Sequence, residues 1–386
     1  MLSLLLLLQA ASGDIVITGK RLVEAHAVCV RGGCTPLRDA QASIALAESQ
    51  FRDGSYLDAK RLLASAISRN EAKAASDPKP VAALYEAYAT VALHGGNQDD
   101  YRRAVARQVA TLRDNLPADD PAVVTASTAL GDMWLKNGNY RQAEATFRGV
   151  EQAALEGKQD RTAALAGMKI ALLAAMTNRA DAANRKIDEI EARPIARNAG
   201  MATALRVVRL RVATRGGKEE EIDRRICELG GTASAGPVLV WAPPYADDAT
   251  SARLANASRF PFDSLANARG TSDETRSSDF AGVQWADVGF WVRPDGRTGE
   301  IEVLRGTPSR AWLTPYLDQV GDRRYSTSNP ADVGGNVEGV YKIERVTRRT
   351  QYATPTNSFI KRRVLAGGFQ ILDLTADASA PPPPSG

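Results

Sequence analysis

The chain has 386 residues, of which 44% are hydrophobic and 24% are charged, and its formal net charge at pH 7 is +4. This length favours two domains, and the composition is that of a globular protein rather than a disordered or fibrous one. A net charge of +4 is too small to indicate nucleic-acid binding by itself. Together with the export that the N-terminus predicts, this leads us to predict no nucleic-acid partner.

The first thirteen residues, MLSLLLLLQAASG, predict a cleavable signal peptide. An apolar run is followed by Ala11-Ser12-Gly13, which fits the small-x-small rule of signal peptidase and would leave Asp14 as the first mature residue. The run is well short of the ~20 residues that a spanning helix needs. No Lys or Arg precedes it, so a start further upstream and an apolar terminus packed into the fold are the alternatives. The prediction is export to the periplasm.

Two of the three cysteines lie close together. Cys29 and Cys34 belong to the segment CVRGGC, whose glycines let the chain turn back sharply. In an oxidising compartment this pair would form a local disulfide. A zinc site would need a second pair of ligands, and a redox motif has two intervening residues instead of four. We predict a Cys29–Cys34 disulfide, with Cys227 left as a buried thiol.

Residues 14–39 form an N-terminal region that precedes the helices. The stretch 14–21, DIVITGKR, predicts a short strand, and it resembles the start of the plug domain of TonB-dependent outer-membrane receptors. Eight residues are too few to carry a function. We interpret them as an edge strand or a linker.

Residues 40–229 contain a repeat of about forty residues that predicts stacked helical hairpins. Tyr56, Tyr101 and Tyr140 are 45 and 39 residues apart, and small and aromatic residues recur around them. The first unit runs from Gly54 to Ala66, the second is degenerate, and the third has its pattern at Gly131, Gly138, Tyr140, Ala143 and Phe147. A fourth unit is expected at 163–193, with Ala183 and Ile187 in the Ala and Phe positions, and a fifth at 202–229.

This pattern resembles the tetratricopeptide repeat in a lengthened form, and a plain helical bundle is the alternative. The resemblance implies a solenoid whose concave face binds an extended peptide or a partner helix. His94 precedes two glycines, so we interpret it as the last residue of a helix, stabilised there by the helix dipole.

The segment 230–236, GGTASAG, predicts a linker to a second domain at 237–375. Residues 237–245 read as extended, and 246–280 as loop with at most one short helix. The clearest signal is a hairpin at 288–304, where Pro294-Asp295-Gly296 separates two alternating apolar runs. We expect a helix within 307–325, either kinked at Pro315 or shortened so that Thr314 caps it and Pro315 is its first residue.

The same alternation predicts a third strand at 339–347, an apolar run follows at 369–374, and 376–386 reads as a disordered Pro-rich tail. The order of these elements resembles the C-terminal domain of TonB energy transducers. The matching residues are Val288, Phe290, Val292, Pro294, Asp295, Gly296, Arg297, Ile301, Val303, Leu304, Arg305, Leu317, Arg323, Arg324 and Tyr325. The chain departs from that family because it has no spanning helix, no long Pro-rich spacer and no intact Pro-x-Tyr-Pro motif.

The resemblance implies that the last strand has an open edge to which a receptor segment adds as a further strand. The partner-binding residues on this reading are Val340, Tyr341, Lys342, Ile343, Glu344, Arg345 and Val346, together with Trp291 and Arg293. TonB-dependent outer-membrane receptors or other envelope proteins would be the partners. The basic stretch 340–365 adds attraction to an anionic envelope surface, and solubility of a strand edge is its alternative.

No constellation of residues indicates catalysis, a metal or a cofactor. The two histidines have no Cys or Ser nucleophile motif beside them, and no Gly-rich loop leads from a strand into a helix. We therefore predict an α-solenoid of tetratricopeptide-like hairpins followed by a small α+β domain with an antiparallel sheet. Its predicted function is non-catalytic protein–protein interaction in the periplasm. A part in TonB-dependent transport, with an anchor upstream, is the alternative, and a hydrolase within 237–280 is a third.

Overall fold

The computed structural model describes residues 19–214, 222–226, 237–243, 245, 283–327, 339–353 and 362–375. For residues 19–20, 349–353 and 362–368 it describes the backbone only. The predicted signal peptide, the linker 230–236, the loop 246–280, the tail 376–386 and Cys227 lie outside the described residues and stay predictions.

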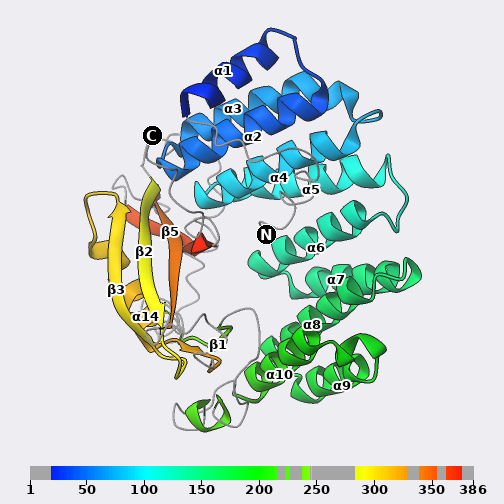
Figure 1. Ribbon diagram of the computed structural model, residues 1–386, viewed down its shortest axis with the longest axis vertical. Coiled ribbons are helices and arrows are strands. Elements are labelled where there is room, and N and C mark those ends of the chain that lie inside the picture. Colours follow the sequence, from blue (N-terminus) through cyan, green and yellow to red (C-terminus); the bar gives the residue numbers. More distant parts are fainter. Residues whose placement is uncertain are drawn as a thin grey trace, which may run out of the picture.

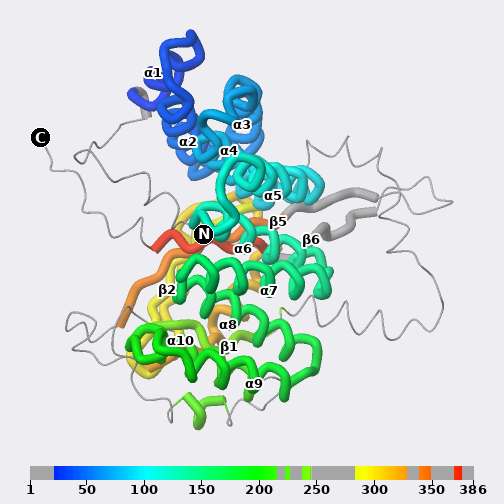
Figure 2. Tube along the Cα trace, turned by 90° about the vertical axis from the view of Figure 1, so that its right-hand side faces the viewer, coloured from blue at the N-terminus to red at the C-terminus, as the bar shows by residue number. Residues whose placement is uncertain are grey.

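Helical hairpins stacked one after another form the N-terminal part of the described chain (Figures 1 and 2). The pairs are α2–α3, α4–α5, α6–α7 and α8–α9, flanked by α1 and α10, and the predicted helical array is thereby confirmed. The bounds are α1 Gly19–Val30, α2 Pro36–Arg52, α3 Tyr56–Asn70, α4 Pro78–His94, α5 Gln98–Arg113, α6 Pro121–Lys136, α7 Tyr140–Glu156, α8 Asp160–Met176, α9 Ala180–Glu191 and α10 Ala199–Ala213.

The predicted N-terminal strand is wrong for residues 19–21, because α1 already begins at Gly19. Further along the chain, side-chain caps and prolines mark several helix starts. Thr35, Asn97, Asp120, Asn139 and Asn198 each accept a hydrogen bond from a backbone N–H of the first turn. Such caps satisfy donors that the helix itself leaves unpaired.

A residue with positive φ closes the turn inside each hairpin and fixes the repeat length. These residues are Gly54, Gly96, Gly138 and Asn178, with φ of 80°, 70°, 71° and 59°. Their spacing of 42, 42 and 40 residues is the structural period. Glycine and asparagine are the residues that adopt this left-handed conformation most readily.

Equivalent positions around this turn are buried in every hairpin. Five residues after it stand Ala59, Tyr101, Ala143 and Ala183, and nine after it stand Leu63, Val105, Phe147 and Ile187. The fourth unit was therefore placed correctly. The tyrosine alignment was wrong in the second unit, because Tyr101 occupies the position of Ala59 rather than that of Tyr56. Close packing between the two helices of a hairpin requires small residues at some positions. At Gly131, for example, a Cβ would lie 2.7 Å from Cδ1 of Phe147.

The second part of the chain is a small sheet with one helix packed on it. Its strands are β1 Leu239–Trp241, β2 Val283–Val292, β3 Thr298–Gly306, β4 Arg324–Tyr325, β5 Val340–Ala353 and β6 Arg362–Asp373. The main sheet is antiparallel in the order β3-β2-β5-β6, and β1 pairs with β4. The predicted hairpin is confirmed, since the turn is closed by Gly296 N donating to Arg293 O (2.9 Å) and Arg297 N to Asp295 Oδ1 (2.9 Å).

Helix α14, Thr314–Asp322, covers one face of this sheet after a short 3-10 turn at Ala311–Leu313. The shorter of the two predicted helices is confirmed, but it starts one residue early: Thr314 is its first residue, Pro315 its second, and Leu313 precedes them. Trp312, Leu313, Tyr316 and Val320 pack against Val288, Phe290 and Val292, the alternate residues of β2. The alternation of apolar residues in β2 therefore identified correctly which side chains of the hairpin face the core.

The predicted open edge at Val340–Thr347 is wrong for residues 343–347, because β5 is an interior strand there. It pairs with β2 over its whole first half, and on its other side Glu344, Arg345, Val346 and Thr347 pair with Asp373, Leu372, Ile371 and Gln370 of β6. Ile343 is also bonded there, since its oxygen accepts from Leu374 N (2.8 Å). The apolar run at 369–374 is the segment that fills the edge left open in the prediction.

None of the helices in the described ranges has both the length and the apolar character required to cross a bilayer.

Candidate functional site

The sheet lies against the turns of the helical hairpins, on the side opposite α14 (Figure 1). Alternate residues of a strand point to opposite faces. Val288, Phe290 and Val292 face α14, whereas Val283 and Trp285 pack against the core of the first hairpin. The array and the sheet therefore share a buried junction.

Arg345 of β5 is the centre of this junction, and its side chain is 0% exposed. Its guanidinium donates to both carboxylate oxygens of Asp287, with Nη2 2.9 Å from Oδ2. It also donates to the backbone oxygens of Phe51 (2.7 Å) and Arg52 (2.8 Å) and to the hydroxyl of Tyr56 (3.2 Å). One cation thus joins two strands of the sheet to the turn of hairpin α2–α3, with its charge balanced by a buried carboxylate.

Aromatic contacts complete the same contact area. The guanidinium carbon of Arg345 lies 4.1 Å from the ring centroid of Trp285 and 5.6 Å from that of Phe51. The indole lies directly over the turn of the hairpin, where a Cβ on Gly54 would be 2.6 Å from Cε2 of Trp285. Gly54 is therefore required twice, by its positive φ and by the approach of Trp285.

The next two hairpins contact the sheet through the position that corresponds to Arg52 in the first hairpin. This position lies two residues before the positive-φ residue of the turn. His94 Nδ1 lies 3.0 Å from Oγ1 of Thr347 in β5, and Lys136 Nζ donates to Oε1 of Gln370 in β6 (3.2 Å). At its other end the sheet region meets the array through Asp223, which pairs with Arg297 (2.7 Å) and Arg324 (3.0 Å). The sheet is thus fixed to the array at both ends.

Burial keeps His94 neutral. Desolvation lowers the pKa of its imidazole to about 3, and the nearby cations Lys136 and Arg345 add to the shift. The prediction that His94 ends its helix is confirmed, since α4 ends at this residue. The prediction that its charge interacts with the helix dipole is wrong, because a neutral ring has no such charge.

On the face towards α14, a second buried ion pair holds Glu344. Its carboxylate accepts from Nη1 of Arg323 (2.9 and 3.0 Å) and from the hydroxyl of Tyr316 (2.6 Å). Burial raises the pKa of Tyr316 well above its usual value, and the neighbouring carboxylate raises it further. Burial opposes the charge on Arg323, but Glu344, Tyr316 and Tyr325 act together against it, and the pKa of the guanidinium is raised overall.

The structure separates the predicted partner-binding residues into two groups. Glu344, Arg345 and Val346 are buried in the contacts above or in the core and cannot serve as a docking strand. Val340, Tyr341, Lys342, Ile343 and Trp291 are half-buried, and Arg293 is exposed. Among these, Trp291 and Tyr341 come together, with ring centroids 5.2 Å apart. Lys342 forms an ion pair with Asp373 of β6, with Nζ 3.6 Å from Oδ2.

A surface that the sequence did not reveal lies on α8. This helix packs against α7, α9 and α10 and is buried on all sides but one. The remaining side carries Leu165, Lys169, Leu172 and Met176, with Leu165 45% and Met176 42% exposed. Lys169 pairs with Asp132 on the corresponding side of α6, so the open sides of α6 and α8 are continuous. We call these two sides the first-helix face, because α6 and α8 are the first helices of their hairpins.

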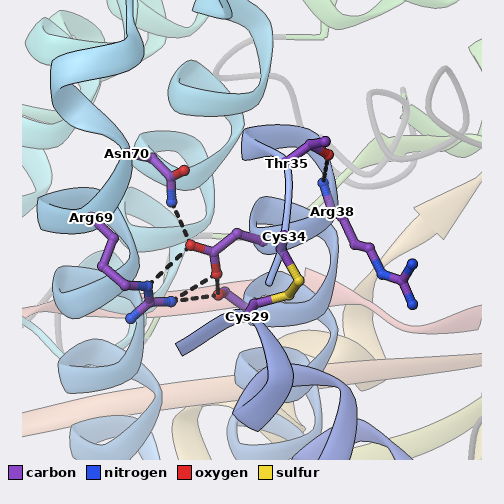
Figure 3. Close-up of a disulfide and its surroundings, with 8 residues drawn as sticks. Cys29, Cys34, Thr35, Arg38, Arg69 and Asn70 are labelled. Carbon is purple, nitrogen blue, oxygen red and sulfur yellow. Dashed lines mark hydrogen bonds and ion pairs between the residues drawn. A yellow bond between two sulfur atoms is a disulfide. The ribbon is translucent and has the colours of Figure 1, made fainter. Parts of the chain in front are cut away.

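The predicted disulfide between Cys29 and Cys34 is present and ties α1 to the start of α2 (Figure 3). Beside it, Asp39 of α2 accepts hydrogen bonds from Arg69 (2.7 and 3.0 Å) and Asn70 (2.7 Å) at the end of α3. These hydrogen bonds explain the lowered pKa of the Asp39 carboxyl, against the opposing effect of its burial. The disulfide thus joins α1 to α2 covalently, and a partly buried ion pair joins α2 to α3.

Within the described ranges, no group of three or more His, Cys, Asp or Glu side chains is placed to hold a metal ion.

Comparisons with known proteins give no family. No family model and no curated protein matches this chain. Among solved structures, a putative kinesin light chain of Podosopora anserina with nearly identical TPR-like repeats covers 50% of this chain and 93% of its own length, at 14% identity and a TM-score of 0.42. BtubC (BKLC) of P. vanneervenii covers 64% of this chain and 95% of its own length, at 15% identity and a TM-score of 0.43.

The Rap conjugation gene regulator of plasmid pLS20, solved with the Phr* peptide, covers 57% of each chain at 15% identity and a TM-score of 0.37. At these values the similarities assign neither a family nor a partner. The resemblance of residues 285–347 to a TonB C-terminal domain stays a prediction.

We expect Arg345→Ala to lower the free energy of unfolding by about 3 kcal/mol, because it leaves Asp287 and the turn oxygens of hairpin α2–α3 buried without their donor. Urea unfolding followed by circular dichroism measures this. Arg305→Ala is the matched control, since Arg305 pairs with the same carboxylate (2.6 Å) but its side chain is 49% exposed. The control should cost less than about 1 kcal/mol. Equal losses in the two variants would contradict a central role for Arg345.

The lowered pKa of His94 predicts an acid-sensitive junction. Between the unfolded pKa of 6.5 and the folded pKa of about 3, the unfolded chain binds more protons at this residue. Stability contributed by neutral His94 is therefore complete above pH 6.5 and falls on acidification, by about 1.4 kcal/mol per pH unit. Between pH 7.5 and pH 5.0 the native chain should lose about 2 kcal/mol more than His94→Gln, as urea unfolding at the two pH values measures. Identical losses would show that His94 titrates normally in the fold.

Proposed function

We infer that this chain is a non-catalytic interaction protein and that the first-helix face binds an apolar segment of a protein partner. The observation that carries this proposal is Leu165, which is 45% exposed on a helix whose other sides are buried. An exposed apolar side chain in a continuous strip on the first helices is the usual form of a binding surface in a helical-repeat protein.

Charge further limits the class of partner. Lys169 is neutralised by Asp132, whereas Lys136 at the end of α6 contacts the uncharged amide of Gln370. The first-helix face therefore has a net positive charge at its end next to the sheet. A segment that places an apolar side chain over Leu165 and a carboxylate near Lys136 has the complementary chemistry.

The sheet restricts where this partner binds. Contacts of Arg345, His94 and Lys136 place it against the turns of the first three hairpins. Strand addition at β5 forms no part of the proposal, because β6 already occupies that side. The sheet is a fixed support for the array in this account, and α8 is the part of the array that receives the partner.

The test replaces Leu165 by Asp and places a photo-crosslinking amino acid at position 161, one turn earlier and also exposed. In cells of the native host, the crosslinker should form a discrete protein adduct, and Leu165→Asp should reduce its yield at least tenfold. Leu155→Asp is the matched control, because Leu155 is 43% exposed but lies on α7, outside the first-helix face. Unfolding midpoints of both variants should equal that of the native chain.

An adduct that persists in Leu165→Asp, or that is lost equally in Leu155→Asp, would refute binding at the first-helix face. Absence of any adduct at position 161, with the chain expressed and folded, would refute it as well.

For the location we propose an oxidising compartment, the periplasm, as the signal-like N-terminus suggests. The Cys29–Cys34 pairing supports this, because such local disulfides persist where thiols are not kept reduced. Intact protein purified from native cells under thiol-blocking conditions should carry no label at Cys29 or Cys34 until it is reduced. Mass spectrometry measures the label, and full labelling before reduction would contradict the proposed location.

A further inference from the structure

Trp291 and Tyr341 form an aromatic surface on the sheet face opposite α14. They stand directly opposite each other on β2 and β5, with their ring centroids 5.2 Å apart. Two features hold the phenol across the sheet: Tyr341 donates to Oε1 of Glu302 on β3 (2.6 Å), and Gly289 leaves room for the ring, since a Cβ there would be 2.6 Å from Cζ of Tyr341. The two rings are therefore fixed side by side before any ligand arrives.

The described chain ends close to this surface. Leu374 N donates to Ile343 O (2.8 Å), and Ile343 N donates to Oγ1 of Thr375 (3.2 Å). Ile343 is two residues from Tyr341 on β5, which is about 7 Å along a strand. Because β6 runs antiparallel to β5, the chain at Thr375 is directed along β5 towards Tyr341.

Eleven residues follow Thr375, with the sequence ADASAPPPPSG. Extended, they reach up to about 36 Å, several times the distance to the aromatic pair. Pro381–Pro384 favours the polyproline II conformation, which loses little entropy on binding and packs well against aromatic rings. The segment contains one acidic side chain, Asp377, and no basic side chain, whereas Arg293 beside Trp291 is exposed.

We propose that the Pro-rich tail, residues 376–386, docks in cis on the surface formed by Trp291 and Tyr341, with Arg293 as the cation that faces its carboxylate. The tether makes this docking effective even for a weak contact. A short flexible connection gives an effective concentration of about 1 mM, so a dissociation constant of about 0.1 mM keeps the tail docked about ten times out of eleven. This docking is independent of the first-helix face on α8.

A peptide titration tests the proposal. A chain that ends at Thr375 and the full chain are each titrated with the synthetic peptide ADASAPPPPSG by isothermal calorimetry. The shortened chain should bind with a dissociation constant of about 0.1 mM, and the full chain at least tenfold more weakly because its own tail occupies the surface. A peptide with the four prolines replaced by alanine should not bind the shortened chain.

Variants of the shortened chain locate the binding surface. Trp291→Ala and Tyr341→Ala should each weaken peptide binding at least tenfold. Tyr140→Ala is the matched control, since Tyr140 is 42% exposed on α7, and it should change nothing. Equal unfolding midpoints show that each variant is folded, and Trp291→Phe, which keeps an aromatic ring, should retain most of the affinity.

Three outcomes overturn the proposal. Equal peptide affinity of the full and the shortened chain would show that the tail does not occupy the surface. Binding that survives both alanine variants would place the peptide elsewhere. No binding by the shortened chain would show that the aromatic pair does not accept a Pro-rich segment.

Discussion

The contact between Arg345 and Asp287 determines how the two parts of this chain are combined. A buried guanidinium needs a carboxylate and acceptors for its remaining N–H groups, and here these come from β2 and from the turn of hairpin α2–α3. Removing either side would leave a charge in a medium that solvates it poorly. The sheet and the helical array therefore behave as a single structural unit at this point.

That constraint extends along the array through the repeat itself. Because each hairpin ends its first helix in the same way, equivalent positions return at a regular interval, and the second and third of them, His94 and Lys136, meet β5 and β6. The fourth equivalent position, Met176, belongs to the helix that carries the exposed Leu165. The same repeat position thus contacts the sheet in the second and third hairpins and is exposed in the fourth.

β6 determines whether β5 can accept a further strand. A three-stranded sheet ending in β5 would present a row of backbone donors and acceptors to any extended segment. Here the chain itself supplies the neighbouring strand over Glu344–Thr347, so recognition by strand addition there would require β6 to leave. The surfaces that we propose for recognition within the described residues, the aromatic pair on the sheet and the first-helix face of the array, both consist of side chains.

Local signals in the sequence determined the elements themselves. The Pro294-Asp295-Gly296 turn, the alternation in β2, the fourth-unit positions of Ala183 and Ile187 and the Cys29–Cys34 pair all depend on residues close in the chain, where φ preferences and side-chain period act directly. The tyrosine spacing misplaced the second unit, because a buried Tyr101 fits where the other hairpins have alanine.

Only the tertiary structure decided which strand lies at the edge of the sheet and which side of α8 stays open. Strand order and the docking of the sheet on the array depend on contacts between residues almost three hundred positions apart, such as Arg345 with Phe51. No local pattern encodes such pairs. A basic residue on a strand reads as a solvated edge until its carboxylate partner and the turn oxygens are placed around it.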